Sequence, residues 1–445
     1  MIRLFIFKAR ERKRDFMKIK VKKSTYSDVL KRPKYVHKNP MKQPLILRKI
    51  MSLVGNADFK ETDFTYSFEG ISGFPDEPCL ILMNHSSFID LEIIAKLLKN
   101  RPYSFVATSD GFVGKEFVMR LIGCIPTNKF VSDITLVSDI TYALKKNKAD
   151  VVMYPEASYS FDGTATPLPR KLGVILKRLD VPVIMITTEG AFARDPLYNC
   201  LQKRKVKVTA KIQMLFSRDE IKEMKVASID SKLDEAFSFD NFKWQSENKV
   251  EITEEFRADG LERILFKCPY CLKEGELKGS GTRIKCSCGV EHELDKYGQL
   301  IKSSEHEVKM PHIPDWYNWQ RQVIRKEIMD GTYKIECDCR ILVLRDLKAI
   351  YDIGQGHLVH DMNGFRLTSD APPSQERLNF KMSPKSSYSL YADYFWYELG
   401  DIICIGNNEM LFYCFPEERA KIPVAKARIA TEEMYKLLKL ERNRG

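Results

Sequence analysis

His85 and Asp90 are the residues whose types and spacing point most directly to chemistry. They lie in the run Cys79–Leu91, in which an apolar strand candidate ends at Asn84 and two serines follow the histidine. The histidine therefore stands at the open end of a buried strand, and the aspartate lies one turn into the next helix, from which it can turn back. A histidine oriented by a carboxylate is a general base that can activate a hydroxyl group.

The composition narrows the choice of base. Between residues 38 and 291, His85 is the only histidine. A His-x4-Asp spacing also arises by chance, and a surface histidine at a strand end followed by an unrelated first-turn aspartate would look the same. If the first half of the chain activates a hydroxyl group with a histidine, no other residue can fill that role.

Four cysteines form a second group with chemical potential. Their spacing is Cys-x2-Cys-x14-Cys-x-Cys, and they are Cys268, Cys271, Cys286 and Cys288. Two close cysteine pairs joined by a charged, glycine-containing stretch are typical of a zinc ribbon, in which four thiolates close a structural tetrahedral site. His292 is a spare ligand if the second pair cannot both reach the metal. Unligated thiols and a dithiol redox pair are the alternatives.

The elements that must position His85 alternate along residues 61–235. Apolar, β-branched runs predict strands and amphipathic runs predict helices, an order typical of an α/β layer with a largely buried sheet. The predicted strands are 79–83, 103–107, 151–154, 181–187 and 206–215, and the predicted helices are 91–99, 113–122, 133–147 and 170–179.

Three further regions follow this α/β domain. Residues 236–262 predict a linker or a helix, 263–303 the zinc ribbon, and 304–445 a helix and a β-rich domain that ends in a C-terminal helix. In the last region, 402–405 and 410–415 flank a Gly-Asn-Asn-Glu turn and predict a hairpin. Several strands followed by one terminal helix would fit a small β-barrel or a pleckstrin-homology-like module.

Positive charge is concentrated at the N-terminus. The chain carries a formal charge of +12, and residues 1–50 contain 17 Lys and Arg against 3 Asp and Glu, so the rest is close to neutral. We expect residues 1–60 to form a basic, partly helical arm, and residues 1–54 to bind an anionic lipid surface. Ile46–Val54 has the pattern of an interfacial helix, although a helix packed on its own domain would look similar.

The apolar runs and the cysteines bear on location. No apolar run is long enough for a transmembrane helix, and the apolar start Met1–Phe7 is too short for a signal-peptide core. The 11 cysteines include the zinc-ribbon set and come with no export signal, so a reducing compartment is expected. We therefore expect a cytoplasmic, peripheral protein on the inner face of a membrane.

Four ordered blocks extend the His85 motif. They are Asn84–Asp90, Gly123–Lys129, Pro155–Ser160 and Val181–Val183, and the second is expected to form a turn that presents its lysine. In this order they resemble the Asn-His-x4-Asp, Gly-x-Ile-Pro, Pro-Glu-Gly-Thr-Arg-Ser-like and Val-Pro-Val-like blocks of glycerolipid acyltransferases of the 1-acylglycerol-3-phosphate type. The resemblance covers residues 61–215 and implies an α/β acyltransferase domain, a mixed sheet flanked by helices, ahead of the zinc ribbon and the β-rich domain.

The resemblance also implies a reaction, in which a lysophospholipid hydroxyl attacks the thioester of acyl-CoA or an acyl-carrier protein during phospholipid biosynthesis. His85 would take the hydroxyl proton, and Asp90 would hold the imidazole tautomer. Lys129 would pair with an acceptor phosphate, and Glu156 and Ser158 would hydrogen-bond the glycerol end. The implied substrate-binding residues are Asn84, Lys129, Glu156, Ser158 and Ser160.

Two departures from the family pattern leave the acceptor open. Tyr159 stands where the third block usually supplies an arginine, and a tyrosine cannot neutralise a phosphate. Thr108–Asp110 stand about where the family has a lysine between the first two blocks. Either another cation supplies the clamp, or the acceptor has no phosphate at this place. The nearby cations are Lys115, Arg120, Lys129 and Arg170.

Two other functions fit parts of the pattern. The basic arm and the ribbon could grip nucleic acid, but basic residues in the ribbon are balanced by acidic ones, whereas a nucleic-acid ribbon usually has a basic excess. The acyltransferase-like region could also be an inactive lipid-binding scaffold. The intact pair of His85 and Asp90 argues against that alternative.

Overall fold

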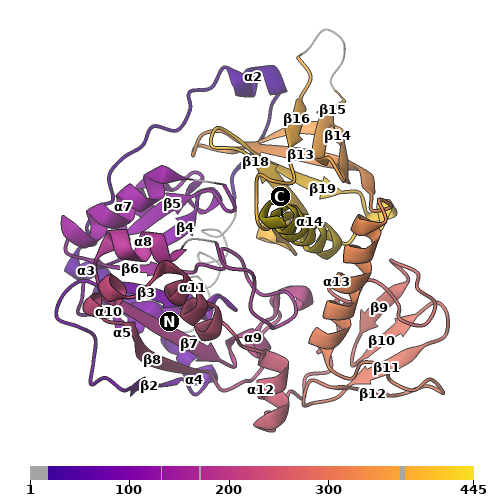
Figure 1. Cartoon of the computed structure of the whole chain (residues 1–445), viewed down its shortest axis with the longest axis horizontal. Helices are drawn as coiled ribbons and strands as arrows, with labels where there is room; N and C mark the ends of the chain where they lie inside the picture. The colour runs from indigo at the N-terminus through magenta and orange to yellow at the C-terminus, as the bar shows by residue number, and fades with distance from the viewer. Residues whose placement is uncertain (1–18, 132, 170–171, 371–375, 445) are drawn as a thin grey trace, which may run out of the picture.

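Three β-sheets organise the computed structural model, which describes residues 19–131, 133–169, 172–370 and 376–444. Figure 1 shows the first sheet and its helices on one side of the molecule, and the third sheet with the last helix on the other. The small second sheet lies beside the helix that leads into the third sheet. The structure is therefore an α/β layer that faces a β-rich region.

The first sheet is mixed and has the strand order β2-β8-β7-β3-β6-β4-β5. β7 and β8 are antiparallel, whereas the other neighbouring pairs are parallel. The central strand β3 is apolar throughout and fully buried, as expected of a strand covered on both faces. The strands are β2 (Thr65–Glu69), β3 (Leu80–Met83), β4 (Tyr103–Thr108), β5 (Cys124–Thr127), β6 (Asp150–Met153), β7 (Val183–Glu189) and β8 (Thr209–Phe216).

Helices cover both faces of this sheet. Leu80 and Leu82 pack on one face with α7, α8, α10 and α11, while Ile81 and Met83 pack on the other with α4 and α5. The predicted mixed sheet flanked by helices is therefore confirmed. The helices are α4 (Asn56–Glu61), α5 (Ile89–Leu97), α6 (Glu116–Leu121), α7 (Ile134–Lys145), α8 (Leu172–Leu179), α9 (Ala191–Arg194), α10 (Arg218–Glu223) and α11 (Val226–Ala236).

The two edge strands of this sheet differ from the sequence prediction. β2 has mostly exposed residues, so it lacks the apolar run by which a buried strand is recognised. β5 covers the Gly-x-Ile-Pro block, for which the sequence predicts a turn. Pro126 is compatible with this strand because β5 lies at the sheet edge, where a missing N–H group costs no pairing on the open side.

The second sheet is a small antiparallel unit that carries the cysteine cluster. Its strand order is β12-β11-β10-β9, and helix α12 (Asn241–Glu247) precedes it along the chain. A long helix, α13 (Ile313–Met329), connects it to the third sheet and begins at a Pro within its first turn. The strands are β9 (Leu277–Ser280), β10 (Arg283–Cys286), β11 (Glu291–Leu294) and β12 (Leu300–Lys302).

The third sheet has the strand order β16-β15-β14-β13-β19-β18-β17, so the long strand β13 joins two antiparallel groups. The predicted hairpin forms between β18 and β19, and helix α14 (Val424–Arg444) follows the last strand. The strands are β13 (Ile335–Leu344), β14 (Ile350–Asp361), β15 (Gly364–Ser369), β16 (Asn379–Met382), β17 (Tyr391–Asp393), β18 (Ile402–Gly406) and β19 (Leu411–Pro416). We refer to residues 335–444 as the C-terminal β domain.

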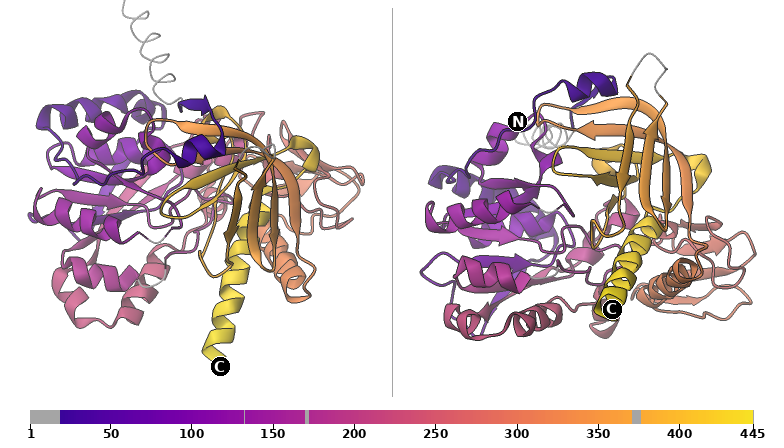
Figure 2. Two further views of the ribbon diagram at one scale, coloured as in Figure 1. Left: turned by 90° about the horizontal axis from the view of Figure 1, so that it is seen from above. Right: turned by 45° about the horizontal axis from the view of Figure 1, so that its top comes forward.

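The N-terminal segment packs on both the α/β layer and the C-terminal β domain. β1 (Val21–Lys23) adds to the third sheet by parallel pairing with β14, and α2 (Tyr26–Leu30) follows it. The chain then crosses to the α/β layer, where α3 (Leu45–Val54) contacts α5. Figure 2 shows this segment, in indigo, passing from the C-terminal β domain to the α/β layer. The first part of the predicted basic arm, residues 1–18, lies outside the described residues.

Candidate active site and metal cluster

The imidazole of His85 lies at the end of β3 and faces the carboxylate of Asp90. The distance from His85 Nδ1 to Asp90 Oδ2 is 3.2 Å. The same oxygen accepts hydrogen bonds from the backbone N–H groups of Ser86 (2.9 Å) and Ser87 (3.0 Å). Asp90 is fully buried, so it is held in place and can fix the tautomer in which Nδ1 carries the proton. The structure thus brings together the two predicted catalytic residues.

The other ring nitrogen of His85 is available. Nε2 has no hydrogen-bond partner among the described residues, and the His85 side chain remains 16% exposed. Burial lowers the pKa of the imidazole below 6.5, and the charge of Lys129 lowers it further, while Asp90 opposes the shift. The ring is therefore neutral at neutral pH, and Nε2 can accept a proton.

Two tyrosine rings hold the imidazole between them. The Tyr154 ring stacks on it with 4.1 Å between centroids, and the Tyr159 ring does so at 4.2 Å. Tyr159 is the residue that replaces the family's arginine in the third block. Its side chain therefore orients the base in this structure, which leaves the charge of the missing arginine unreplaced at this position.

Asn84, immediately before His85, binds the neighbouring strand. Its amide Oδ1 accepts from the backbone N–H of Thr188 (2.8 Å), and its Nδ2 donates to the Thr188 carbonyl (3.1 Å). Asn84 is completely buried, so these bonds tie the end of β3 to β7. The substrate contact that the family resemblance implies for Asn84 stays a prediction.

A buried network of charged side chains supports the loop that follows His85. The Ser87 hydroxyl donates to Asp195, whose carboxylate also pairs with Arg194 at 2.8 Å. Arg194 in turn pairs with Asp58 of α4 at 2.9 Å. Burial raises the pKa of Asp195 to about 7, although Arg194 and Ser87 oppose the shift. Sequence analysis missed this network, because its members come from separate segments and match no spaced motif.

The third block, Pro155–Ser160, closes against the His85 backbone. Glu156 is fully buried and accepts hydrogen bonds from the backbone N–H groups of His85 (3.1 Å) and Thr166 (2.8 Å). Burial raises the pKa of Glu156 to about 7, while these two bonds oppose the shift. Glu156 therefore braces the loop that carries His85.

Three neighbours of Glu156 in this block behave differently from one another. The Ser160 hydroxyl donates to the Thr164 carbonyl (2.6 Å), whereas the buried Ser158 hydroxyl has no partner among the described residues. Of the two predicted serine contacts, Ser158 therefore has the free hydroxyl. Ala157 stands at the family's glycine position and has φ +56°, a conformation that favours glycine.

Lys129, the cation of the second block, points toward the C-terminal β domain. Its ammonium group lies 4.0 Å from the centroid of the Tyr391 ring in β17. It makes no ion pair with any residue in the described ranges. Burial lowers its pKa, whereas Asp393 and Asp110 raise it and Arg428 lowers it. Lys129 is thus a partly buried cation that no carboxylate among the described residues pairs with at close range.

Of the other cations that the sequence offered, Arg120 is occupied. Arg120 bonds Glu116 at 3.1 Å and donates to the carbonyls of Lys38 (3.0 Å) and Asn39 (3.3 Å), so it secures the N-terminal segment. Arg170 lies outside the described residues. Lys129 is the candidate whose charge acts on His85, since it lowers the pKa of the imidazole.

The four cysteines form one compact cluster. Their sulfur atoms all lie within 4.8 Å of one another, with 3.8 Å between Cys268 and Cys288 and 3.7 Å between Cys271 and Cys286. Four thiolates about 2.3 Å from a tetrahedral zinc ion stand about 3.8 Å apart, so the cluster fits that ion. The spare ligand is not needed, since His292 Nε2 instead interacts with the Tyr270 hydroxyl at 3.1 Å.

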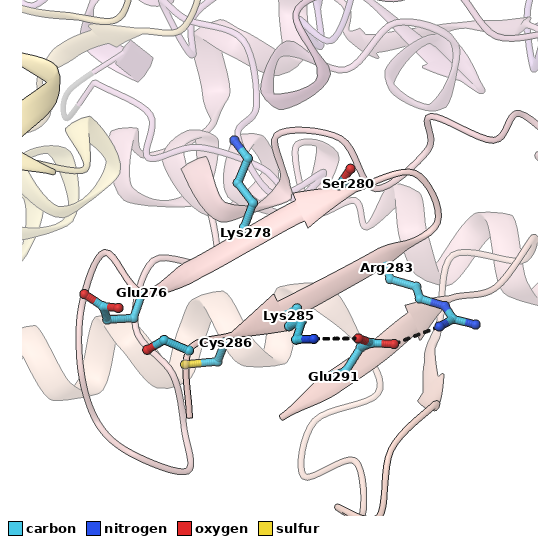
Figure 3. A pocket seen from close by; sticks show the side chains of 8 residues that line it. Glu276, Lys278, Ser280, Arg283, Lys285, Cys286 and Glu291 are labelled. Atoms are coloured by element: carbon cyan, nitrogen blue, oxygen red, sulfur yellow. Dashed lines mark hydrogen bonds and ion pairs between the residues drawn. The ribbon is translucent and has the colours of Figure 1, made fainter. Parts of the chain in front are cut away.

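The outer face of this sheet has a shallow hollow of about 420 Å³ next to the cluster (Figure 3). Charged side chains line it, but they neutralise one another. Glu291 pairs with Arg283 at 2.8 Å and with Lys285 at 3.7 Å, and Lys278 pairs with Glu262 at 2.6 Å. The hollow therefore has no unpaired row of cations for a phosphate backbone to follow.

Residues 65–188 match the family model described as Acyltransferase, and this range holds all four sequence blocks. These residues form an acyltransferase domain. The 1-acyl-sn-glycerol-3-phosphate acyltransferase BAT2, chloroplastic, of Brassica napus is 27% identical to the chain over 150 residues. That match covers 32% of this chain and 42% of the relative, so the chain spans less than half of the relative's length. The predicted acyltransferase domain is confirmed within residues 65–188.

One solved structure is also similar. It is the crystal structure of the 1-acyl-sn-glycerophosphate (LPA) acyltransferase PlsC from Thermotoga maritima, with 17% identity and a TM-score of 0.31. The likeness covers 43% of this chain and 78% of the other.

Among the described residues, no helix combines the length and apolar character needed to cross a bilayer.

Proposed function

We propose that this protein transfers an acyl chain from an acyl thioester to the free hydroxyl of a lysophospholipid such as 1-acylglycerol-3-phosphate, as a step of phospholipid biosynthesis. The observation that carries this proposal is the neutral imidazole of His85, braced by Asp90 and with Nε2 free among the described residues. A hydroxyl group is a weak nucleophile at neutral pH, and a base of this kind is what it needs.

The reaction begins with the acceptor hydroxyl hydrogen-bonded to His85 Nε2. The oxygen attacks the thioester carbonyl carbon as Nε2 takes its proton, so that a C–O bond forms and the imidazole becomes positively charged. Asp90, paired with Nδ1, stabilises that charge. When the C–S bond breaks, the imidazolium returns the proton to the thiolate of acyl-CoA or of an acyl-carrier protein, and the base is regenerated.

Acceptor binding is assigned to the second and third blocks. Lys129 provides positive charge close enough to lower the pKa of His85. Ser158 offers a hydroxyl group with no partner among the described residues, and Glu156 holds the backbone beside it. We assign Ser160 and Asn84 to support of this loop, since the side chains of both hydrogen-bond to backbone atoms.

Helix α3 supports association with a membrane surface. Its outer face carries Ile46 (76% exposed), Leu53 (64%) and Ile50 (54%), whereas the polar Arg48 and Ser52 face inward. An exposed apolar face beside basic residues is the pattern of a helix that lies in a lipid interface. We infer that α3 and the basic residues before it hold the protein on the inner face of a membrane, where both lysolipid and product dissolve.

The cysteine cluster is assigned a structural zinc ion. Four cysteine ligands leave no open position for water, so the ion would stabilise the small second sheet. No step of acyl transfer passes through it.

An acyl-transfer assay of the purified chain tests the function. The chain would be mixed with a panel of lysophospholipids and with acyl-CoA or acyl-carrier protein as donor, and His85→Ala would be the control. We expect release of free thiol together with a diacylated product, both absent with His85→Ala. Absence of product from every acceptor and donor pair in the unaltered protein would refute the proposal.

A further inference from the structure

The C-terminal β domain covers both blocks that are assigned to the acceptor. On the second block, Lys129 lies over the Tyr391 ring, and the ring of Phe130, the next residue, meets the Tyr388 ring edge-on at 5.4 Å. Directly after the third block, the guanidinium group of Arg428 lies 4.5 Å from the centroid of the Phe161 ring. The acceptor side of the site is therefore built from two domains.

Asp110 fixes this arrangement. This buried carboxylate lies in the α/β layer, and its Oδ2 accepts hydrogen bonds from three side chains of the C-terminal β domain. The donors are the Tyr391 hydroxyl (2.9 Å), Trp396 Nε1 (3.3 Å) and the Tyr413 hydroxyl (3.3 Å). The position of β17 over Lys129 is therefore determined by a specific buried contact.

Arg428 of α14 brings a second cation to the third block. It is only 3% exposed, and its Nη1 donates to the backbone carbonyl of Tyr159 (3.4 Å). Tyr159 is the position at which the family has an arginine. The charge of Arg428 also acts on Glu156. Burial raises the pKa of Glu156, and the positive charge of Arg428 partly opposes that rise.

The charge of Arg428 is incompletely neutralised. Its Nε lies 3.3 Å from Glu432, but that carboxylate also pairs with Arg321 at 2.7 Å and accepts from the Ser389 hydroxyl at 2.7 Å. The Nη2 group of Arg428 has no hydrogen-bond partner in the described part of the chain. A guanidinium group that shares its carboxylate retains donors for an anionic ligand.

We propose that Arg428 and Lys129 form an inter-domain site for the acidic headgroup of the acceptor, so that the C-terminal β domain selects acceptors that carry a phosphate. This inference rests on the proposed acyl transfer and deepens it. Arg428 supplies the positive charge that Tyr159 does not, and it does so from a helix far along the chain. A phosphate between these two cations would offset the cost of burying Lys129 without a close counter-ion.

A comparison of two acceptors tests this site in the full-length protein. We would measure transfer from acyl-CoA to 1-acylglycerol-3-phosphate and to the phosphate-free 1-acylglycerol with the same acyl chain, both in mixed micelles. The variants are Arg428→Gln and Arg428→Lys. Lys439→Gln, which removes an exposed cation from the same helix, is the matched control.

We expect Arg428→Gln to raise the KM for the phosphate acceptor at least about tenfold and to leave the KM for the neutral acceptor within about twofold. Arg428→Lys should fall between the two, because it keeps the charge and loses the forked geometry. Equal losses with both acceptors, or no change with either, would overturn the inference. If Arg428→Gln lacks a cooperative thermal unfolding transition, Arg428→Lys becomes the test. A rise in its KM for the phosphate acceptor alone would support the inference, and equal changes with both acceptors would overturn it.

Failure of the inference and failure of the proposed function give different results. If the unaltered protein transfers acyl chains but its Arg428 variants do not distinguish the two acceptors, only the inference fails. If the unaltered protein transfers nothing, the proposed function fails. Calorimetric titration with glycerol 3-phosphate, with glycerol as the control, then reports on the anion site itself. Binding of the phosphate compound that weakens in Arg428→Gln would support the site, and no binding would refute it.

Discussion

The base and the proposed anion site are built in opposite ways. The pairing of His85 with Asp90 is local, because the aspartate and the backbone groups that hold it lie within five residues of the imidazole. Glu156 and two tyrosine rings add support from another segment of the same domain. Lys129 and Arg428 come from different domains, and Asp110 helps to dock β17 over the second block. A site built within one domain forms whenever that domain folds. An assembled site depends on every contact that docks one domain on the other.

This difference predicts which changes alter the chemistry and which alter the choice of acceptor. Damage at His85 should reduce transfer to all acceptors alike. Damage to the docking of the C-terminal β domain should separate acceptors that carry a phosphate from those that do not.

The largest effect is expected from His85→Ala. Loss of a general base typically reduces the rate by about 10²–10⁴-fold, and no second histidine in the acyltransferase domain can replace it. The measurement is kcat/KM for both acceptors, which should fall by the same factor, with an unchanged unfolding temperature as the check on folding. A loss confined to one acceptor would contradict the assignment of His85 as the base.

A smaller effect is expected from Asp110→Asn, which weakens the docking contact. An amide keeps one acceptor oxygen but loses the charge that three donors share, so the free energy of unfolding should fall by about 2 kcal/mol. The KM for the phosphate acceptor should rise, while kcat for the neutral acceptor changes little. Asp219→Asn, an exposed position on α10, is the control. Unchanged stability would mean that this contact does not hold the domains together.

Loss of the proposed zinc ion should affect the inter-domain anion site and not the base. The second sheet braces α14 through Glu274, which pairs with Lys426 at 2.8 Å, and the cysteine cluster orders the loop that carries this glutamate. Cys288→Ser should therefore abolish tight zinc binding, lower the unfolding temperature and weaken the acceptor preference. Metal analysis and thermal unfolding measure the first two effects, with Cys200→Ser as the control outside the cluster. A Cys288→Ser protein with full zinc content would contradict the four-cysteine site.

The smallest effect concerns pH. The base must be neutral, and burial lowers the pKa of His85 below 6.5, so the neutral form persists to lower pH than for an exposed histidine. The acidic limb of kcat/KM against pH should therefore have its midpoint below 6.5. Lys129→Gln removes a charge that lowers this pKa, so the midpoint should move upward. A downward move, or a midpoint above 6.5 in the unaltered protein, would contradict this account of the site.

The same contrast explains what could be predicted from the sequence. Strand β3, His85, Asp90 and the four cysteines were predictable because their signals are contiguous or regularly spaced. Strand β2 was not, since its residues are mostly exposed, and β5 was predicted as a turn because Gly and Pro dominate its local pattern.

Side chains whose partners are distant in the sequence were the least predictable. The sequence around Asp195 contains no signal for its bond to Ser87, and the sequence around Arg428 contains none for its bond to the Tyr159 carbonyl. Asn84 matches the family motif, but its bonds to Thr188 became evident only once β3 and β7 were placed side by side. Tertiary contacts of this kind leave no periodic trace in a single sequence.

The parallel pairing of β1 with β14 has a consequence for biosynthesis. Val21–Lys23 leave the ribosome long before their partners, Ile350–Asp352, are made. Until then β1 is an unpaired edge with no neighbour to join. The parallel pairing of β1 with β14 can therefore form only after residue 352 has been made, and a chain truncated before residue 350 leaves β1 without its partner strand.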